Sequence, residues 1–215
     1  MSIATMILGE SGTGKSTSLR NMKASDVLLI QAIKKPLPFR SKEWKHYDAD
    51  KAPTGNIHVR DESESIISAM QKTKKKIIVL DDFQYVLANE FMRRSAEVGF
   101  TKFSEIGKHA WDILMCAAEL PDDVRVYILA HTETTESGKV KVKTIGKMLD
   151  DKITLEGMLT IVLRTSVVNG NYLFSTQNNG SDTVKSPMGL FEDETIENDL
   201  AAVDAAIQEY YSITA

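Results

Sequence analysis

The chain has very little cysteine and no long hydrophobic run, and each absence excludes a class of protein. Cys116 is the only cysteine among 215 residues, which excludes an internal disulfide and a cysteine-rich metal site. We expect its thiol to be buried, because it falls in an apolar helical stretch. No apolar run approaches the roughly 20 residues that a membrane span requires. A core strand is predicted from Ile3 onward, so we expect no signal peptide, no membrane association and a cytoplasmic location.

An excess of positive charge is also lacking. The 26 Lys and Arg residues are outnumbered by 30 Asp and Glu residues, which gives a net charge of −4. Any contact with nucleic acid must therefore come from a local basic patch. The length suits one α/β domain, and no segment reads as a linker, so we expect a single domain over 1–215.

The segment Gly9–Ser16 reads Gly-Glu-Ser-Gly-Thr-Gly-Lys-Ser, a complete phosphate-binding loop. A buried strand is predicted before it, at Ile3–Leu8, and a helix after it, at Thr17–Met22. Backbone N–H groups of the loop and the positive end of the helix are expected to face an anion. The sequence therefore predicts a nucleoside triphosphate site, with contacts from Gly9, Glu10, Ser11, Gly12, Thr13, Gly14, Lys15, Ser16 and Thr17. Lys15 reaches the β- and γ-phosphates, and Ser16 ligates Mg²⁺.

An acidic pair follows a second buried strand. Four large apolar residues, Ile77–Leu80, lead into Asp81 and Asp82. Such a strand is covered on both faces of a parallel sheet. About 65 residues after a phosphate loop, it predicts that Asp81 binds Mg²⁺ and that Asp82 polarises the attacking water.

Apolar runs and helical spacings alternate along the rest of the chain. Asn169-Gly170 is typical of a hairpin turn. The pattern predicts an α/β fold with a mostly parallel sheet and an antiparallel C-terminal edge hairpin. Further strands are predicted at Val27–Ile30, Asn56–Val59, Val124–Leu129, Thr160–Leu163 and Tyr172–Phe174. Helices are predicted at Glu62–Lys72, Phe103–Leu120 and Ile196–Tyr210, the last within a C-terminal helix of about 193–211 that packs on the core, and a loop is predicted at Gln177–Gly189.

The order of these pieces resembles the RecA-like core ATPases. More narrowly, it is similar to small phage-encoded AAA-family nucleotide-binding proteins, which include the Sak-type single-strand annealing proteins of phage recombination. The matching residues are 9–16, 77–82, Tyr-Ile-Leu-Ala-His at 127–131, and the polar segment at 175–187. The resemblance implies a three-layer RecA-like core, ATP with Mg²⁺, a homo-oligomer, single-stranded DNA and a single-strand-binding protein as partners, and a phage-infected bacterial host.

The resemblance also implies roles for single residues. His131 stands where a polar residue senses the γ-phosphate. Two loops that contact DNA correspond to Asn89–Lys102 and Thr132–Lys147. Lys185 is a candidate finger toward a neighbouring subunit, with Lys147 and Arg164 as other candidates. The DNA-binding candidates in the loops are Arg93, Arg94, Lys102, Lys139, Lys141 and Lys143.

Two departures from the family pattern bear on catalysis and assembly. Gln31 stands where recombinases carry a catalytic glutamate, and an amide cannot act as a base. Asp82 then takes over that role, or hydrolysis is slow or needs DNA. The recombinase-type N-terminal polymerisation segment is also not found, which argues against filament formation and strand exchange.

Three functions therefore stay open. The first is a DNA-dependent ATPase of phage recombination, the second a small-molecule or nucleotide kinase, and the third a non-catalytic ATP switch that binds a partner. The late loops hold scattered Lys and few Arg, unlike the Arg-rich lid of many kinases. No Asn-Lys-x-Asp segment for guanine is found, which favours ATP.

Overall fold

The structure, a computed structural model, describes residues 1–146 and 153–213. No helix within these ranges is long and apolar enough to cross a membrane. The helices are η1 (Ser16–Asn21), η2 (Ala24–Asp26), α1 (Ser63–Lys72), α2 (Phe83–Arg93), α3 (Thr101–Glu119), η3 (Leu155–Met158) and α5 (Leu200–Tyr210), where η marks a 3₁₀ helix. The strands are β1 (Ile3–Leu8), β2 (Val27–Gln31), β3 (Ile57–Val59), β4 (Ile77–Asp81), β5 (Arg125–Ala130), β6 (Thr132–Thr134), β7 (Val140–Val142), β8 (Ile161–Val168), β9 (Asn171–Ser175) and β10 (Thr195–Glu197).

An eight-stranded sheet runs through the described residues in the order β10-β9-β8-β1-β5-β4-β2-β3. The pairs from β8 to β3 are parallel, whereas β9 and β10 add antiparallel strands at one edge. The predicted fold class, a mixed α/β fold with a mostly parallel sheet and an antiparallel C-terminal edge, is confirmed. The turn at Asn169-Gly170 joins β8 to β9 as predicted, with φ of 52° and 80° at its two residues.

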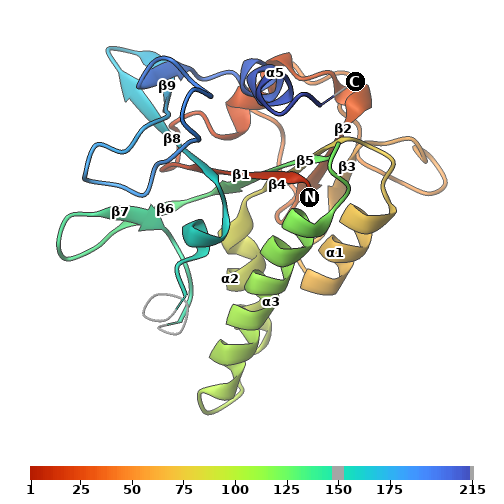
Figure 1. The fold of residues 1–215 in the computed structure, drawn as a ribbon. Coiled ribbons are helices and arrows are strands. Elements are labelled where there is room, and N and C mark those ends of the chain that lie inside the picture. The colour runs from red at the N-terminus through yellow and green to blue at the C-terminus, as the bar shows by residue number, and fades with distance from the viewer. Residues whose placement is uncertain (147–152, 214–215) are drawn as a thin grey trace.

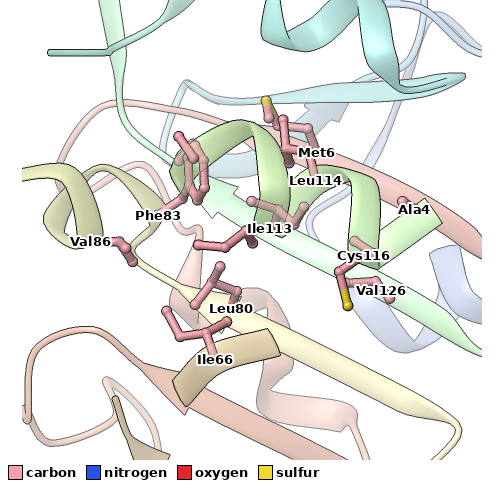
Figure 2. Packing of buried hydrophobic residues seen from close by; sticks show 14 of the residues in the cluster. Ala4, Met6, Ile66, Leu80, Phe83, Val86, Ile113, Leu114, Cys116 and Val126 are labelled. Carbon is pink, nitrogen blue, oxygen red and sulfur yellow. The ribbon is translucent and has the colours of Figure 1, made fainter. Parts of the chain in front are cut away.

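Helices cover both faces of this sheet, with α1, α2 and α3 on one face and α5 on the other (Figure 1). The side chains of β1 alternate between the two layers, as the pleat requires. Met6 belongs to the core under α1–α3, and Ile7 belongs to the core under α5. Figure 2 shows the first core, where Leu80 of β4 and Ile113 of α3 lie among the packed side chains. Cys116 of α3 is buried there, as predicted.

Helix α5 is fixed to the sheet by a buried polar group. Asp204 of α5 accepts hydrogen bonds from Arg125 at 2.9 and 3.0 Å and from the Tyr127 hydroxyl at 2.5 Å. Arg125 and Asp204 are 6% and 4% exposed, and Tyr127 is fully buried. Removing Asp204 would leave Arg125 and Tyr127 buried without their shared acceptor, which is strongly destabilising.

Several predicted boundaries were wrong. The helix predicted at Thr17–Met22 is the short 3₁₀ helix η1, which ends at Asn21 with Met22 as its C-cap. Residues 195–197 form the edge strand β10, and α5 begins only at Leu200, with the Asp199 carboxylate accepting from the Ala201 N–H as its cap. The polar loop after Ala130 contains the β6–β7 hairpin.

The predicted loop Asn89–Lys102 is shorter in the structure. Its first residues, up to Arg93, continue α2, and its last two, from Thr101, begin α3, which leaves residues 94–100 as the loop. Helix α3 begins at Thr101, before the predicted start at Phe103. The segment Gln177–Gly189 is largely irregular, as predicted, and it makes backbone bridges to Val140 and Val162.

Candidate active site at the phosphate loop

Four parallel strands bring the candidate residues to one edge of the sheet. Gly9 follows β1, His131 follows β5, Asp81 ends β4, and Gln31 ends β2 beside it in register. Carboxyl ends of parallel strands meet at the same edge, where ligands of open α/β sheets bind. Residues that are far apart in sequence therefore form one site.

The phosphate loop depends on glycine at particular positions. Gly12 and Gly14 have φ of 80° and 100°, a backbone conformation that residues other than glycine rarely adopt. A Cβ on Gly9 would lie 1.8 Å from Oγ1 of Thr165, and one on Gly14 would lie 2.9 Å from the Tyr172 ring. The loop is thus packed tightly against β8 and β9.

Lys15 and Ser16 point into the interior of the site. Lys15 is 6% exposed, and its Nζ donates to the carbonyl oxygens of Gly9 at 2.8 Å and Glu10 at 2.9 Å. Burial lowers the pKa of Lys15. The Ser16 hydroxyl donates to both carboxylate oxygens of Asp81, at 3.0 and 3.1 Å. These contacts join the loop to the acidic strand.

Asp81 and Asp82 are adjacent buried carboxyls with different electrostatic surroundings. Asp81 is fully buried, and burial together with the charge of Asp82 raises its pKa to about 6. Burial also opposes the charge of Asp82, but hydrogen bonds from His131 and Lys35 outweigh it and lower the pKa of Asp82. Asp82 therefore carries the negative charge of the pair more readily than Asp81.

His131 lies beside Asp82, at the end of β5. Its Nε2 is 3.5 Å from Oδ1 of Asp82, and its ring meets the Tyr85 ring edge-on with centroids 6.2 Å apart. Its backbone N–H donates to Gln84 at 3.2 Å. The predicted role of His131 in sensing the γ-phosphate stays a prediction.

Lys35 is a candidate that no sequence motif marks. It follows β2 in the stretch Ile33–Pro36, and its Nζ donates to Asp82 and lies 3.6 Å from Oδ2 of Asp81. Burial lowers the pKa of Lys35, but the two carboxylates outweigh burial and raise it overall. The only signal for Lys35 in the sequence was its position after β2, a strand that neighbours β4. Spacing alone does not say where a loop side chain points.

These residues surround a cavity of about 470 Å³. Its walls come from the phosphate loop, the segment after β2, the start of α2, and β9. The lining residues are Ser11, Gly12, Gly14, Lys15, Ser16, Thr17, Ile33, Lys35, Pro36, Pro38, Asp82, Tyr85, His131 and Tyr172. A neighbouring cavity is lined by Glu10, Ser11 and Lys143. The hydroxyl groups of Thr13 and Thr165 are joined by a hydrogen bond of 2.6 Å.

The oxygen donors at the site suit one particular kind of cation. A serine hydroxyl and a carboxylate are hard ligands, and among the described residues no group of three or more His, Cys, Asp or Glu is placed to hold a metal by itself. Mg²⁺ keeps several waters and takes one or two protein oxygens together with substrate phosphates. Ser16 and Asp81 therefore fit magnesium that arrives with a nucleotide.

The predicted basic residues of the first DNA loop form ion pairs or hydrogen bonds with other residues of the chain. Arg94 pairs with Glu90, Glu97 and Glu105. Lys102 is 8% exposed, and its Nζ donates to the carbonyl oxygens of Arg94 and Glu97. Arg93 pairs with Asp61 at 2.6 Å. Lys102 is thus buried and Arg94 lies among three carboxylates, and the predicted DNA-binding roles of these residues stay predictions.

The second predicted DNA segment is better placed. Lys139, Lys141 and Lys143 alternate along β7 and its ends, with buried Val142 between the last two. Lys141 pairs with Glu133 at 3.1 Å, whereas Lys139 and Lys143 are exposed. Lys143 lines the cavity that adjoins the phosphate loop.

Arg164 and Lys185, the two candidate fingers within the described residues, do not line the cavity. Arg164 pairs with Asp182 at 3.3 Å, and the backbone of Lys185 pairs with Val162 of β8. Lys147 lies outside the described residues. A finger acts on a neighbouring subunit, so the role of Lys185 stays a prediction.

Comparisons with known proteins identify no narrow family. No family model and no curated protein matches the chain. Solved structures do match, among them a DnaB-like replicative helicase described with its interactions with primase, at 16% identity and a TM-score of 0.48 over 80% of this chain. The chain spans 51% of that helicase chain, and the helicase's activity and partners are not transferred to it. The chain carries a complete phosphate-loop motif, and the acidic end of β4 lies beside it.

Proposed function

We propose that this chain is an ATPase that binds ATP with Mg²⁺ at the phosphate loop and hydrolyses it. The observation that carries the proposal is the contact between Ser16 and Asp81, at 3.0 Å, beside the buried Lys15. A phosphate-contacting lysine, a hydroxyl and a carboxylate at one strand edge are the parts that phosphoryl transfer requires.

Each residue has a stated task in this proposal. Ser16 and Asp81 hold the metal, and Lys15 leaves the carbonyls of its own loop to contact the β- and γ-phosphates. Asp82, whose pKa is lowered, stays ionised and polarises the attacking water by accepting a hydrogen bond from it. When bound, Mg²⁺ neutralises charge on the phosphates. His131 lies against Asp82 and orients its carboxylate.

We propose single-stranded DNA as the partner of the β6–β7 hairpin. Lys139 and Lys143 are exposed there, and Lys143 lies at a cavity that shares Ser11 and His131 with the nucleotide cavity. Such contacts are to phosphates, so binding would be sensitive to salt and weakly specific for sequence. With the family resemblance, this supports a role in phage recombination as an oligomeric annealing protein.

One observation favours a second function, a non-catalytic ATP switch. Gln31 is fully buried next to Asp81, and its amide supplies no base where the family pattern has a carboxylate. A chain without an effective base would bind ATP and change a partner's affinity without hydrolysing the ATP. This alternative keeps every binding residue and differs only in the rate of hydrolysis.

Steady-state ATP turnover with and without single-stranded DNA separates these functions. Stimulation of turnover by DNA at low salt supports the DNA-dependent ATPase. Tight ATP binding without turnover supports the switch. Transfer of the γ-phosphate to an added nucleotide acceptor would identify a kinase, and failure to bind ATP with Mg²⁺ would overturn the proposal.

A further inference from the structure

We propose that Lys35 is a second phosphate-binding cation of this site, which moves from the Asp81–Asp82 pair to the γ-phosphate when Mg-ATP binds. The inference rests on the proposed function, because it concerns the same cavity, and it assigns a role that no sequence motif predicts.

The position of Lys35 supports this role. Its Nζ faces both carboxylates, donating to Asp82 and lying 3.6 Å from Asp81. It lines the same cavity as Lys15 of the phosphate loop. Its side chain is 34% exposed, so the cation already faces the space that a nucleotide would enter.

The charges at the site give a reason for the movement. Two carboxylates, Asp81 and Asp82, face two ammonium groups, Lys15 and Lys35. A divalent cation held by Asp81 would repel Lys35 and replace it as the partner of that carboxylate. The phosphates would then be the nearest negative charge for a lysine on a flexible four-carbon stem.

The backbone around Lys35 is held in place, while its side chain is partly exposed at the cavity. Gln31 is fully buried at the end of β2, and its Nε2 donates to the carbonyl oxygen of Lys35 at 3.2 Å. Pro36 and Pro38 follow in the same cavity wall and restrict the backbone. Gln31, which is not a base, thus positions a cation beside the acidic pair.

The test compares binding of ADP and of a non-hydrolysable ATP analogue by calorimetry at saturating Mg²⁺. Only the analogue carries a γ-phosphate. Lys35→Ala should weaken binding of the analogue about tenfold or more and binding of ADP by less than about threefold, as expected when one charged hydrogen bond is removed. Lys35→Arg should restore part of the preference for the analogue. Lys34→Ala, an exposed neighbour with the same charge change, should alter both affinities less than about twofold.

Thermal unfolding without nucleotide checks the folded state of each variant. Lys35→Ala is expected to lower Tm, because it leaves two buried carboxylates without their cation. A lower Tm with an unchanged ratio of analogue to ADP affinity would assign Lys35 a structural role and overturn the inference. Tighter binding of the analogue by Lys35→Ala, or equal losses in Lys34→Ala, would overturn it as well. Failure of the parent chain to bind either nucleotide would instead overturn the proposed function.

Discussion

The Ser16 hydroxyl donates to the Asp81 carboxylate at 3.0 Å, although 65 residues separate the two in sequence. The contact joins the phosphate loop after β1 to the end of β4, with β5 lying between the two strands in the sheet. It places the two predicted Mg²⁺ ligands within reach of one ion. The consequences for binding and turnover can be measured separately.

Lys15→Ala should abolish tight binding of ATP or lower turnover about a hundredfold or more. The substitution removes a cation that stabilises negative charge on the phosphates in the transition state. Calorimetry and phosphate release measure the two effects, with Lys42→Ala as a control on an exposed lysine. Near-normal turnover in a folded Lys15→Ala variant would contradict the central assignment of this site.

Asp81 and Asp82 should separate by role. Asp81→Asn should weaken nucleotide binding that depends on Mg²⁺, because it removes a charge from the metal's shell. Asp82→Asn should leave binding largely intact and lower kcat, because an amide lacks the negative charge that polarises the attacking water. Titration of Mg²⁺ in a binding assay, followed by steady-state kinetics, measures both. Turnover at the parent rate in Asp82→Asn would require a base elsewhere.

The DNA proposal predicts that Lys139 and Lys143 contribute more to the binding of single-stranded DNA than two other exposed lysines do. Replacing Lys139 and Lys143 by Ala should weaken single-strand binding and flatten its slope against log salt by up to ~1.4, since each phosphate that a lysine neutralises on a single strand contributes about 0.7. The control, Lys72 with Lys74, has the same charge change and precedes the amino end of β4. Fluorescence anisotropy over a salt series measures the slopes. Equal losses of DNA binding from both pairs would mean that only general electrostatic attraction is at work.

Asp204→Ala should destabilise the fold by about 3–5 kcal/mol, because it leaves Arg125 and Tyr127 buried without their shared acceptor. Urea unfolding measures the free energy of unfolding. Glu209→Ala, at an exposed position of the same helix, should change it by less than about 0.5 kcal/mol. Similar values for the two variants would mean that the buried group does not hold α5 to the sheet.

Local sequence patterns predicted the strands of the core and the phosphate loop. Ile77–Leu80 is a continuous apolar run, and Ile3–Leu8 is apolar except for Thr5, because helices cover both faces of the sheet; such runs are visible in sequence. The loop motif is equally local, because Gly12 and Gly14 supply backbone conformations that neighbouring residues cannot. Element ends were predicted less well, as β10 shows, because its pairing with β9 at the edge of the sheet replaced the predicted start of the last helix.

The sequence by itself determined which chemistry is present: a phosphate loop, an acidic pair and a set of lysines. Only the tertiary structure decided which lysines are available. Lys102 is buried and Arg94 is surrounded by carboxylates, whereas Lys35, which no motif marks, lies against Asp81 and Asp82. The physical reason is that motifs record backbone geometry over a few residues. The partner of a long charged side chain depends instead on which loops the sheet order brings together.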